Sequence, residues 1–124
     1  MTGLPGFEDR DLLPRLLPLS REELDRLPFG VTVLGPGDVV RFSNLTECQQ
    51  SGFGPRLREG RLFFTDIAPC LRGPAFRGRI EAARQSGKLD ITFDFIGDFA
   101  SAERELRVRV QAAPDGDIWI FIRR

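Results

Sequence analysis

The chain has 124 residues, which is enough for one domain with a single hydrophobic core. Its 18 lysine and arginine residues balance 18 aspartate and glutamate residues, so the composition indicates neither a nucleic-acid-binding nor an anionic-membrane-binding protein. Histidine, the usual general base and the commonest transition-metal ligand, is absent. We therefore expect no enzyme, no catalytic residue and no metal site.

The sequence also predicts a location. No stretch approaches the roughly 20 consecutive apolar residues of a membrane-spanning helix. The opening residues, MTGLPGFEDRDLL, carry acidic side chains where a secretion signal has a basic end and an apolar run. We expect a cytoplasmic protein in which the two cysteines, Cys48 and Cys70, are free thiols.

Residues 11–27, DLLPRLLPLSREELDRL, predict short amphipathic helices that are broken by Pro14 and Pro18. Ser20 and Glu23 have the spacing of a capping box for the second helix. We expect residues 1–28 to form an N-terminal helical cap, hereafter the cap, and residues 29–124 to form the domain proper.

The domain proper opens with two β-like runs, at residues 29–34 and 39–42, separated by the turn sequence GPGD. This pattern predicts a β-hairpin. Ser43 follows as a suitable N-cap for a short helix. A glycine-rich segment that includes Gly52 comes next and predicts a loop.

The second half of the chain predicts a longer helix and three strands. Pro74 and the apolar residues Phe76, Ile80 and Ala83 predict a helix that ends at Gly87. Strands are predicted within residues 89–99, 104–113 and 117–124. Two strands, a set of helices and three further strands favour an α+β fold, a five-stranded antiparallel sheet with helices on one face.

Cys70 stands in the segment DIAPCLRGPAF. A thiol with no histidine beside it can still accept an acyl group from an activated thioester, because the thiolate is intrinsically nucleophilic. An isolated buried cysteine is, however, more often a small inert side chain. Cys48 has no comparable context, so we expect it to be structural.

The order of elements, together with FFTDIAPC at residues 63–70 and the closing DIWIFIRR, resembles the photoactive yellow protein family of blue-light receptors. The resemblance implies a PAS fold and a p-coumaric acid chromophore, or a related acyl group, linked as a thioester to Cys70. Ala68 and Pro69 precede that cysteine as in the family, and Phe63 and Phe64 lie upstream.

The resemblance also implies which residues contact the chromophore. Phe42, Thr46 and Gln50 align with the tyrosine, glutamic acid and threonine at the phenol end in the family. Phe42 cannot donate a hydrogen bond and Thr46 offers one hydroxyl, so a neutral phenol is predicted at pH 7. The predicted contacts are Phe42, Thr46, Gln50, Gly52, Phe63, Ala68, Pro69, Phe95 and Phe99.

Three functions stay open at this point. The first is a sensory photoreceptor with altered contacts at the phenol end, whose partner is its chromophore and a signalling protein or a second copy. The second is a non-photosensory PAS protein in which Cys70 holds a less polar acyl group or a small ligand. The third is a bare PAS interaction module.

Overall fold

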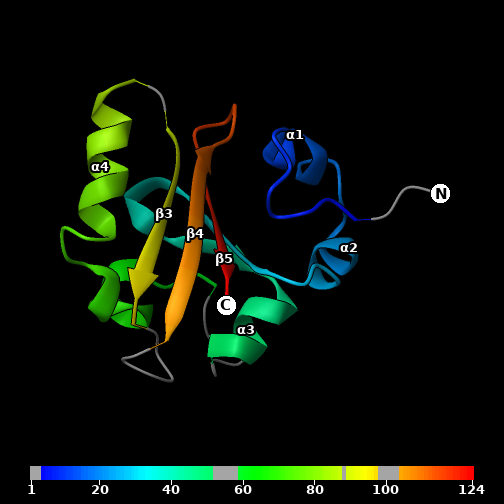
Figure 1. Ribbon diagram of the computed structural model, residues 1–124, viewed down its shortest axis with the longest axis horizontal. Coiled ribbons are helices and arrows are strands. Elements are labelled where there is room, and N and C mark those ends of the chain that lie inside the picture. Colours follow the sequence, from blue (N-terminus) through cyan, green and yellow to red (C-terminus); the bar gives the residue numbers. More distant parts are fainter. Residues whose placement is uncertain (1–3, 52–58, 88, 98–103) are drawn as a thin grey trace.

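The computed structural model describes residues 4–51, 59–87, 89–97 and 104–124. One antiparallel sheet of five strands, in the order β2-β1-β5-β4-β3, runs through the molecule (Figure 1). The predicted five-stranded antiparallel sheet is therefore confirmed. The strands are β1 (Gly30–Leu34), β2 (Val40–Ser43), β3 (Asp90–Ile96), β4 (Glu105–Ala112) and β5 (Ile118–Arg123).

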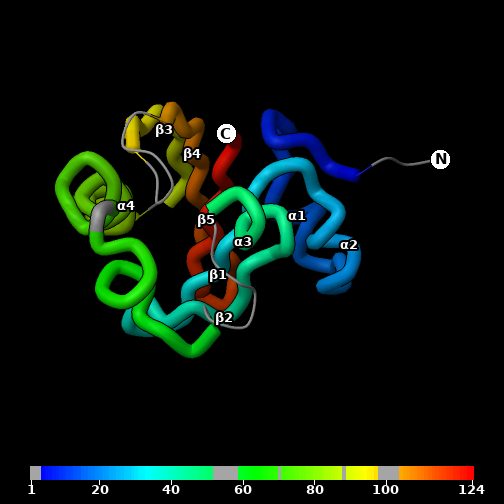
Figure 2. Tube along the Cα trace, turned by 90° about the horizontal axis from the view of Figure 1, so that it is seen from below, coloured from blue at the N-terminus to red at the C-terminus, as the bar shows by residue number. Residues whose placement is uncertain are grey.

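Side chains alternate between the two faces of each strand, and each face has its own hydrophobic cluster. On β5, Ile118, Ile120 and Ile122 enter one cluster, whereas Phe121 enters the other. We call the face with the isoleucines the core face and the opposite face the cap face. Figure 2 shows the strands between α4 on one side and α1 and α2 on the other. The predicted sheet flanked by helices with an N-terminal helical cap is confirmed, and the cap covers the face opposite α4.

The cap contains α1 (Leu12–Leu16) and α2 (Arg21–Asp25). The predicted capping box is confirmed, because the Ser20 hydroxyl accepts from the Glu23 N–H and the Glu23 carboxylate accepts from the Ser20 N–H. Pro14 lies inside α1 and does not break it. A proline is tolerated there because N–H groups in a first helical turn have no partner within the helix.

The β1–β2 hairpin is confirmed, and its turn forms the short helix η1 (Pro36–Asp38), in which Gly37 has a φ of 72°. The following helix, α3 (Leu45–Ser51), is not capped by Ser43, which belongs to β2. Asn44 takes that place: its Oδ1 accepts from the N–H groups of Glu47 and Val31, both at 2.9 Å. Asn44 thus joins the start of α3 to β1.

Two short helical turns, η3 (Phe63–Ile67) and η4 (Pro69–Leu71), precede α4 (Arg77–Gln85) on the core face. The predicted start of the long helix at Pro74 is wrong by three residues, because Pro74, Ala75 and Phe76 form a turn and the helix begins at Arg77. Gly87, with a φ of 85°, closes the C-terminal end as predicted. Among the described residues no helix is long and apolar enough to cross a membrane.

Candidate functional site

The backbone around Cys70 lies against the core face of the sheet. Cys70 is the middle residue of η4, and its neighbours Ala68 and Leu71 are almost fully buried in the core-face cluster. The Ala68 N–H donates to the Phe63 carbonyl at 2.7 Å, and the Leu71 N–H donates to the Ala68 carbonyl at 2.9 Å. These bonds fix the segment that carries Cys70, whose own side chain lies outside what the structure describes.

Phenylalanine rings line the core face beside this segment. Phe76 makes edge-to-face contacts with Phe93 and Phe95, with ring centroids 5.4 and 5.3 Å apart. Phe63 contacts Phe64 at 4.9 Å in the same geometry. The structure therefore brings Phe63, Ala68 and Phe95 together in one cluster, whereas Pro69 is exposed beside them.

A buried ion pair lies over the start of β1. Glu47 on α3 and Arg124, which follows β5, have side chains that are each 1% exposed. The guanidinium donates from Nη1 to Oε1 at 2.7 Å and from Nη2 to Oε2 at 3.1 Å. Gln50 lies beside the pair, since its Oε1 accepts from Arg124 Nη1 at 3.5 Å.

The register of the strands places this pair on the core face. Gly30 lies opposite Ile122, so a side chain at position 30 would point toward the core-face cluster. The Glu47 carboxylate occupies that space, because a Cβ added to Gly30 would overlap Glu47 Oε1. Thr32 and Ser43 lie on the same face, with their hydroxyl oxygens 3.1 Å apart.

Phe42 and Thr46 are directed elsewhere. Phe42 lies opposite Val33 on the cap face, within the cluster formed by the cap, and the guanidinium of Arg21 lies 4.9 Å from its ring centre. The Thr46 hydroxyl donates to the carbonyl of Leu27 at 2.5 Å. The structure thus does not bring these two residues together with Phe63, Ala68 and Phe95. Gly52 and Phe99 lie outside the described residues.

Glu47 and Arg124 were not predicted from the sequence, and Ser43 was predicted only as an N-cap. Residues 42, 46 and 50 and residues 43, 47 and 51 have the same spacing, so spacing alone does not decide between them. The second set puts Ser43, Glu47 and Ser51, all buried, on the core side. The polar stripe S-x-x-x-E-x-x-x-S was the available signal, since a glutamate inside such a stripe is rarely buried without a specific partner.

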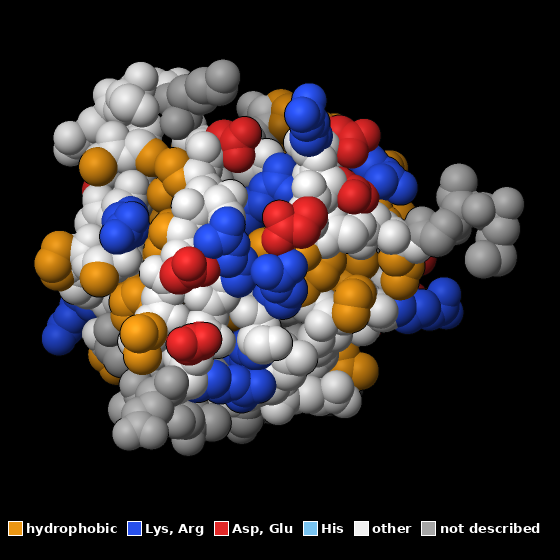
Figure 3. Space-filling model, viewed as in Figure 1, with side chains coloured by type: hydrophobic (Ala, Val, Ile, Leu, Met, Phe, Trp, Pro, Cys, Tyr) orange, Lys and Arg blue, Asp and Glu red, His pale blue; other side chains and the backbone are white. Residues whose placement is uncertain are grey.

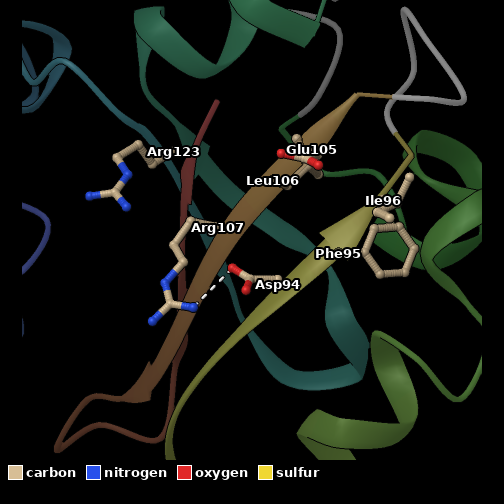
Figure 4. Close-up of a pocket in the computed structure, with 7 residues that line it drawn as sticks. All are labelled: Asp94, Phe95, Ile96, Glu105, Leu106, Arg107 and Arg123. Atoms are coloured by element: carbon tan, nitrogen blue, oxygen red, sulfur yellow. Dashed lines mark hydrogen bonds and ion pairs between the residues drawn. The ribbon is translucent and has the colours of Figure 1, made fainter.

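A separate groove of about 360 Å³ lies at the ends of β3 and β4 (Figure 4). Asp94 and Arg107 form an ion pair across it at 2.9 Å, and this hydrogen bond and the charge of Asp94 raise the pKa of the Arg107 guanidinium. Figure 3 shows acidic and basic side chains intermixed over this face. The charged residues of the groove alternate with core residues along β4, so the groove opens away from Ala68. No cluster of metal-ligating side chains occurs in the described part of the chain.

We compared the chain with known protein families, curated proteins and solved structures. A scan against protein-family models gives no match. Photoactive yellow protein of Rhodobacter capsulatus is 30% identical over 109 residues, covering 86% of this chain and 88% of that protein. The chain belongs to the photoactive yellow protein family.

Solved structures agree with the family and with the predicted fold. The photoactive yellow protein domain of the sensor histidine kinase Ppr from Rhodospirillum centenum has 39% identity and a TM-score of 0.78, covering 86% of this chain and 94% of that domain. A PAS domain of an HTR-like protein from Haloarcula marismortui shares the fold, with a TM-score of 0.59 at 14% identity. The chain is therefore a PAS domain of the kind found in sensors.

Proposed function

We propose that this member of the photoactive yellow protein family is a photoreceptor that carries a p-coumaroyl-type group as a thioester on Cys70. One observation supports it most: the segment around Cys70, a phenylalanine wall and a buried polar group all belong to the same face of the sheet. A p-coumaroyl group needs a thiol at one end, an apolar surface along its length and a polar group at its phenol end.

Attachment requires an acyl donor of the thioester class. The Cys70 thiolate attacks the carbonyl carbon of an activated p-coumaroyl thioester, a new C–S bond forms, and the original C–S bond breaks. The leaving thiolate takes up the proton that Cys70 gave to solvent. No general base from the protein is needed, which agrees with the absence of histidine.

The residues present fit such a group, with contacts shifted by one position from those that the sequence predicted. Phe63 and Phe95 supply apolar and aromatic surface along its length. In this proposal Glu47, with Ser43 and Ser51 on the same side and Gln50 beside its ion pair, meets the phenol end in place of Thr46 and Phe42. A bound p-coumaroyl group supplies light absorption and a light-driven change of shape about its double bond.

α3 is the element that would pass this change to the cap. Glu47 on one side of the helix meets the phenol end, while Thr46 on the other side is bonded to the Leu27 carbonyl. The Asn44 side-chain amide donates to the carbonyls of Leu24 and Phe29 at 2.8 and 3.1 Å. A displacement of Glu47 therefore strains hydrogen bonds that hold the cap, and the cap loosens.

The downstream partner in this proposal is a signalling protein. The related domain from Rhodospirillum centenum belongs to a sensor histidine kinase, which couples such a domain to signal output. Loosening of the cap would uncover Phe42 and Phe121 on the cap face, and this apolar surface is what a partner would bind.

Mass spectrometry tests the attachment. Full-length protein incubated with an activated p-coumaroyl thioester should gain one acyl group, and peptide mapping should place it on Cys70. The Cys70→Ser variant should gain none, whereas Cys48→Ser, a change at the buried cysteine of α3, should react like the wild type. Labelling of Cys48 alone, or equal labelling of both cysteines, would rule out the proposal.

A further inference from the structure

At one edge of the sheet, β3 directs backbone groups away from β4, the strand with which it pairs. The Gly97 N–H donates to the Arg104 carbonyl at 2.8 Å, and the Ala112 N–H donates to the Leu89 carbonyl at 3.2 Å. In an antiparallel pair, bonded and non-bonded pairs of opposite residues alternate, so the odd-numbered residues of β3 bond to β4. The residues whose N–H and C=O groups point outward are Asp90, Thr92, Asp94 and Ile96.

The opposite edge of the sheet is already covered in part. Beside β2, the Val40 N–H donates to the Arg61 carbonyl and the Gly60 N–H donates to the Val40 carbonyl, both at 2.8 Å. Within the described ranges, no comparable segment bonds to the outward groups of β3. Figure 2 shows β3 at the end of the layer of strands, with α4 beside that layer. An extended chain can add to such an edge as a further strand.

A groove of about 420 Å³ lies beside this edge, between α4 and β3. Ala82 and Ala83 of α4 leave room in it because their side chains are small. Arg79 forms another part of the wall, with its guanidinium 5.2 Å from the centre of the Phe93 ring on the core face. Side chains of an added strand that point to the core face would enter this groove, which therefore favours apolar residues at those positions.

Acidic side chains lie on the cap-face side of the same edge. Asp90 and Asp94 stand on either side of Thr92, and the Asp94 side chain is 75% exposed. Arg107 offsets the charge of Asp94, whereas Asp90 accepts from the uncharged amide of Gln111 at 3.3 Å. A second copy of β3 would bring further aspartates alongside these two, and like charges on neighbouring strands are destabilising. A strand with lysine or arginine at alternate positions has the complementary charge.

We propose that the outward edge of β3 binds an extended basic segment of a partner protein, which adds to the sheet as an antiparallel strand. Basic side chains of that segment face Asp90 and Asp94, and the apolar side chains between them enter the groove beside Ala82. Antiparallel pairing is the more stable kind per residue, and every pair in this sheet has it. The surface is separate from Cys70 and lies at the other edge of the sheet from Phe42 on β2, so the inference does not depend on acylation.

Probe peptides test the strand addition on the full chain by titration calorimetry. The probe is an acetylated and amidated peptide in which valine alternates with lysine. In an antiparallel added strand its lysines lie opposite Asp90, Thr92 and Asp94, so the lysine N–H groups are the ones that bond to β3. N-methylation of the lysine backbone nitrogens should weaken binding by about tenfold or more, while N-methylation of the valine nitrogens should change it by no more than about twofold. Equal effects of the two methylations would overturn the inference.

The charge of the partner is tested by a probe with glutamate in place of lysine. This probe should bind about fivefold more weakly or worse, because its carboxylates lie opposite Asp90 and Asp94. Asp90→Asn, which keeps an oxygen for the Gln111 amide, should reduce the difference between the two probes. Glu22→Gln, a change at an exposed carboxylate of α2, is the matched control and should leave the difference as it is. Equal binding of both probes to the wild type would contradict a basic partner.

Hydrogen exchange locates the bound probe. The N–H groups of Thr92 and Asp94 should exchange about tenfold more slowly, or less, when the probe is bound, whereas those of Ile91 and Phe93 already bond to β4 and should change little. Slowing elsewhere without slowing at Thr92 and Asp94 would refute the proposal. Slowing at these two groups without any probe, growing with protein concentration, would assign the edge to a second copy of this chain and would equally refute it.

Discussion

At the scale of the single residue, Gly30 is a position where the site and the stability of the fold meet. The Glu47 carboxylate fills the space that a side chain at Gly30 would take, and the glutamate cannot move aside because Arg124 holds both its oxygens. Gly30→Ala should therefore destabilise the protein by about 1–3 kcal/mol, the range for overpacking in a well-packed core. Urea unfolding measures this change.

Gly35→Ala is the matched control. A Cβ at Gly35 would meet the guanidinium end of Arg41, which pairs with Asp117 at 3.1 Å but belongs to a flexible side chain that is 56% exposed and can shift at the cost of that one partly exposed ion pair. Gly35→Ala should change the free energy of unfolding by no more than about 0.5 kcal/mol. Equal losses at the two positions would mean that the Glu47 carboxylate is not held rigidly over Gly30.

At the scale of the element, one arginine on β4 holds the first segment of the cap. Arg109 is 8% exposed and donates to the carbonyls of Phe7, Asp9 and Arg10 at 2.9, 2.5 and 3.3 Å. Hydrogen bonds from a charged donor contribute about 1.5–3 kcal/mol each when they are buried. Arg109→Met should increase hydrogen exchange in residues 7–16 by at least tenfold, with little change in β1 and β5.

Arg107→Met provides the comparison for this experiment. Arg107 lies two residues away on the same face of β4, but its partner is the exposed Asp94 on β3 rather than the cap. Exchange in residues 7–16 should be unchanged in this variant. Equal protection in Arg109→Met and wild type would show that apolar contacts of Phe7 and Leu12 suffice to hold the segment.

The elements also show what the sequence could and could not predict. The strands and the Ser20–Glu23 capping box follow from local patterns, namely alternation and short-range spacing, and both are confirmed. The N-cap of α3 was predicted at Ser43 and is found at Asn44. The Asn44 side chain bonds to β1 as well as to the helix, and this tertiary contact is not contained in any local sequence pattern.

The residues predicted from the sequence for the phenol end, Phe42 and Thr46, stay a prediction, and the structure directs them away from the core face on which Ser43 and Glu47 lie. The sets 42/46/50 and 43/47/51 have the same spacing, but the first member of each lies in β2 and the other two in α3, so helical periodicity alone does not choose between them. The choice depends on which face of β2 is turned to the core, and this is set by the pairing of Ser43 with Thr32. Arg124, far away in sequence, had no local signal at all.

At the scale of the whole molecule, the cap and the domain proper share their hydrophobic interior. Leu12, Leu16 and Leu24 from the cap pack with Phe29 and Phe121 from the sheet. The boundary at residue 28 was predicted from the change from a helical to a β-like sequence pattern. Because the two parts share one hydrophobic cluster, we expect them to unfold together. Trp119, the single tryptophan, packs at the edge of this shared cluster and its fluorescence reports on it.

Deletion of residues 1–28 should accordingly lower the stability of the whole sheet. Uncovering Phe29 and Phe121 alone costs about 1.5–3 kcal/mol for each side chain, a large fraction of the roughly 5–15 kcal/mol that holds a typical domain folded. We expect red-shifted Trp119 emission and a lower urea midpoint in residues 29–124. Deletion of residues 1–4 alone should leave the Trp119 emission and the urea midpoint unchanged, since Leu4 is exposed.

In the full chain, fluorescence and circular dichroism should give one coincident transition, because Phe121 on the cap face and Ile120 on the core face are neighbours on β5 and lose their packing in the same step. Two separate transitions, or an unchanged midpoint after the long deletion, would mean that the core-face cluster is stable by itself and that the cap only rests on it.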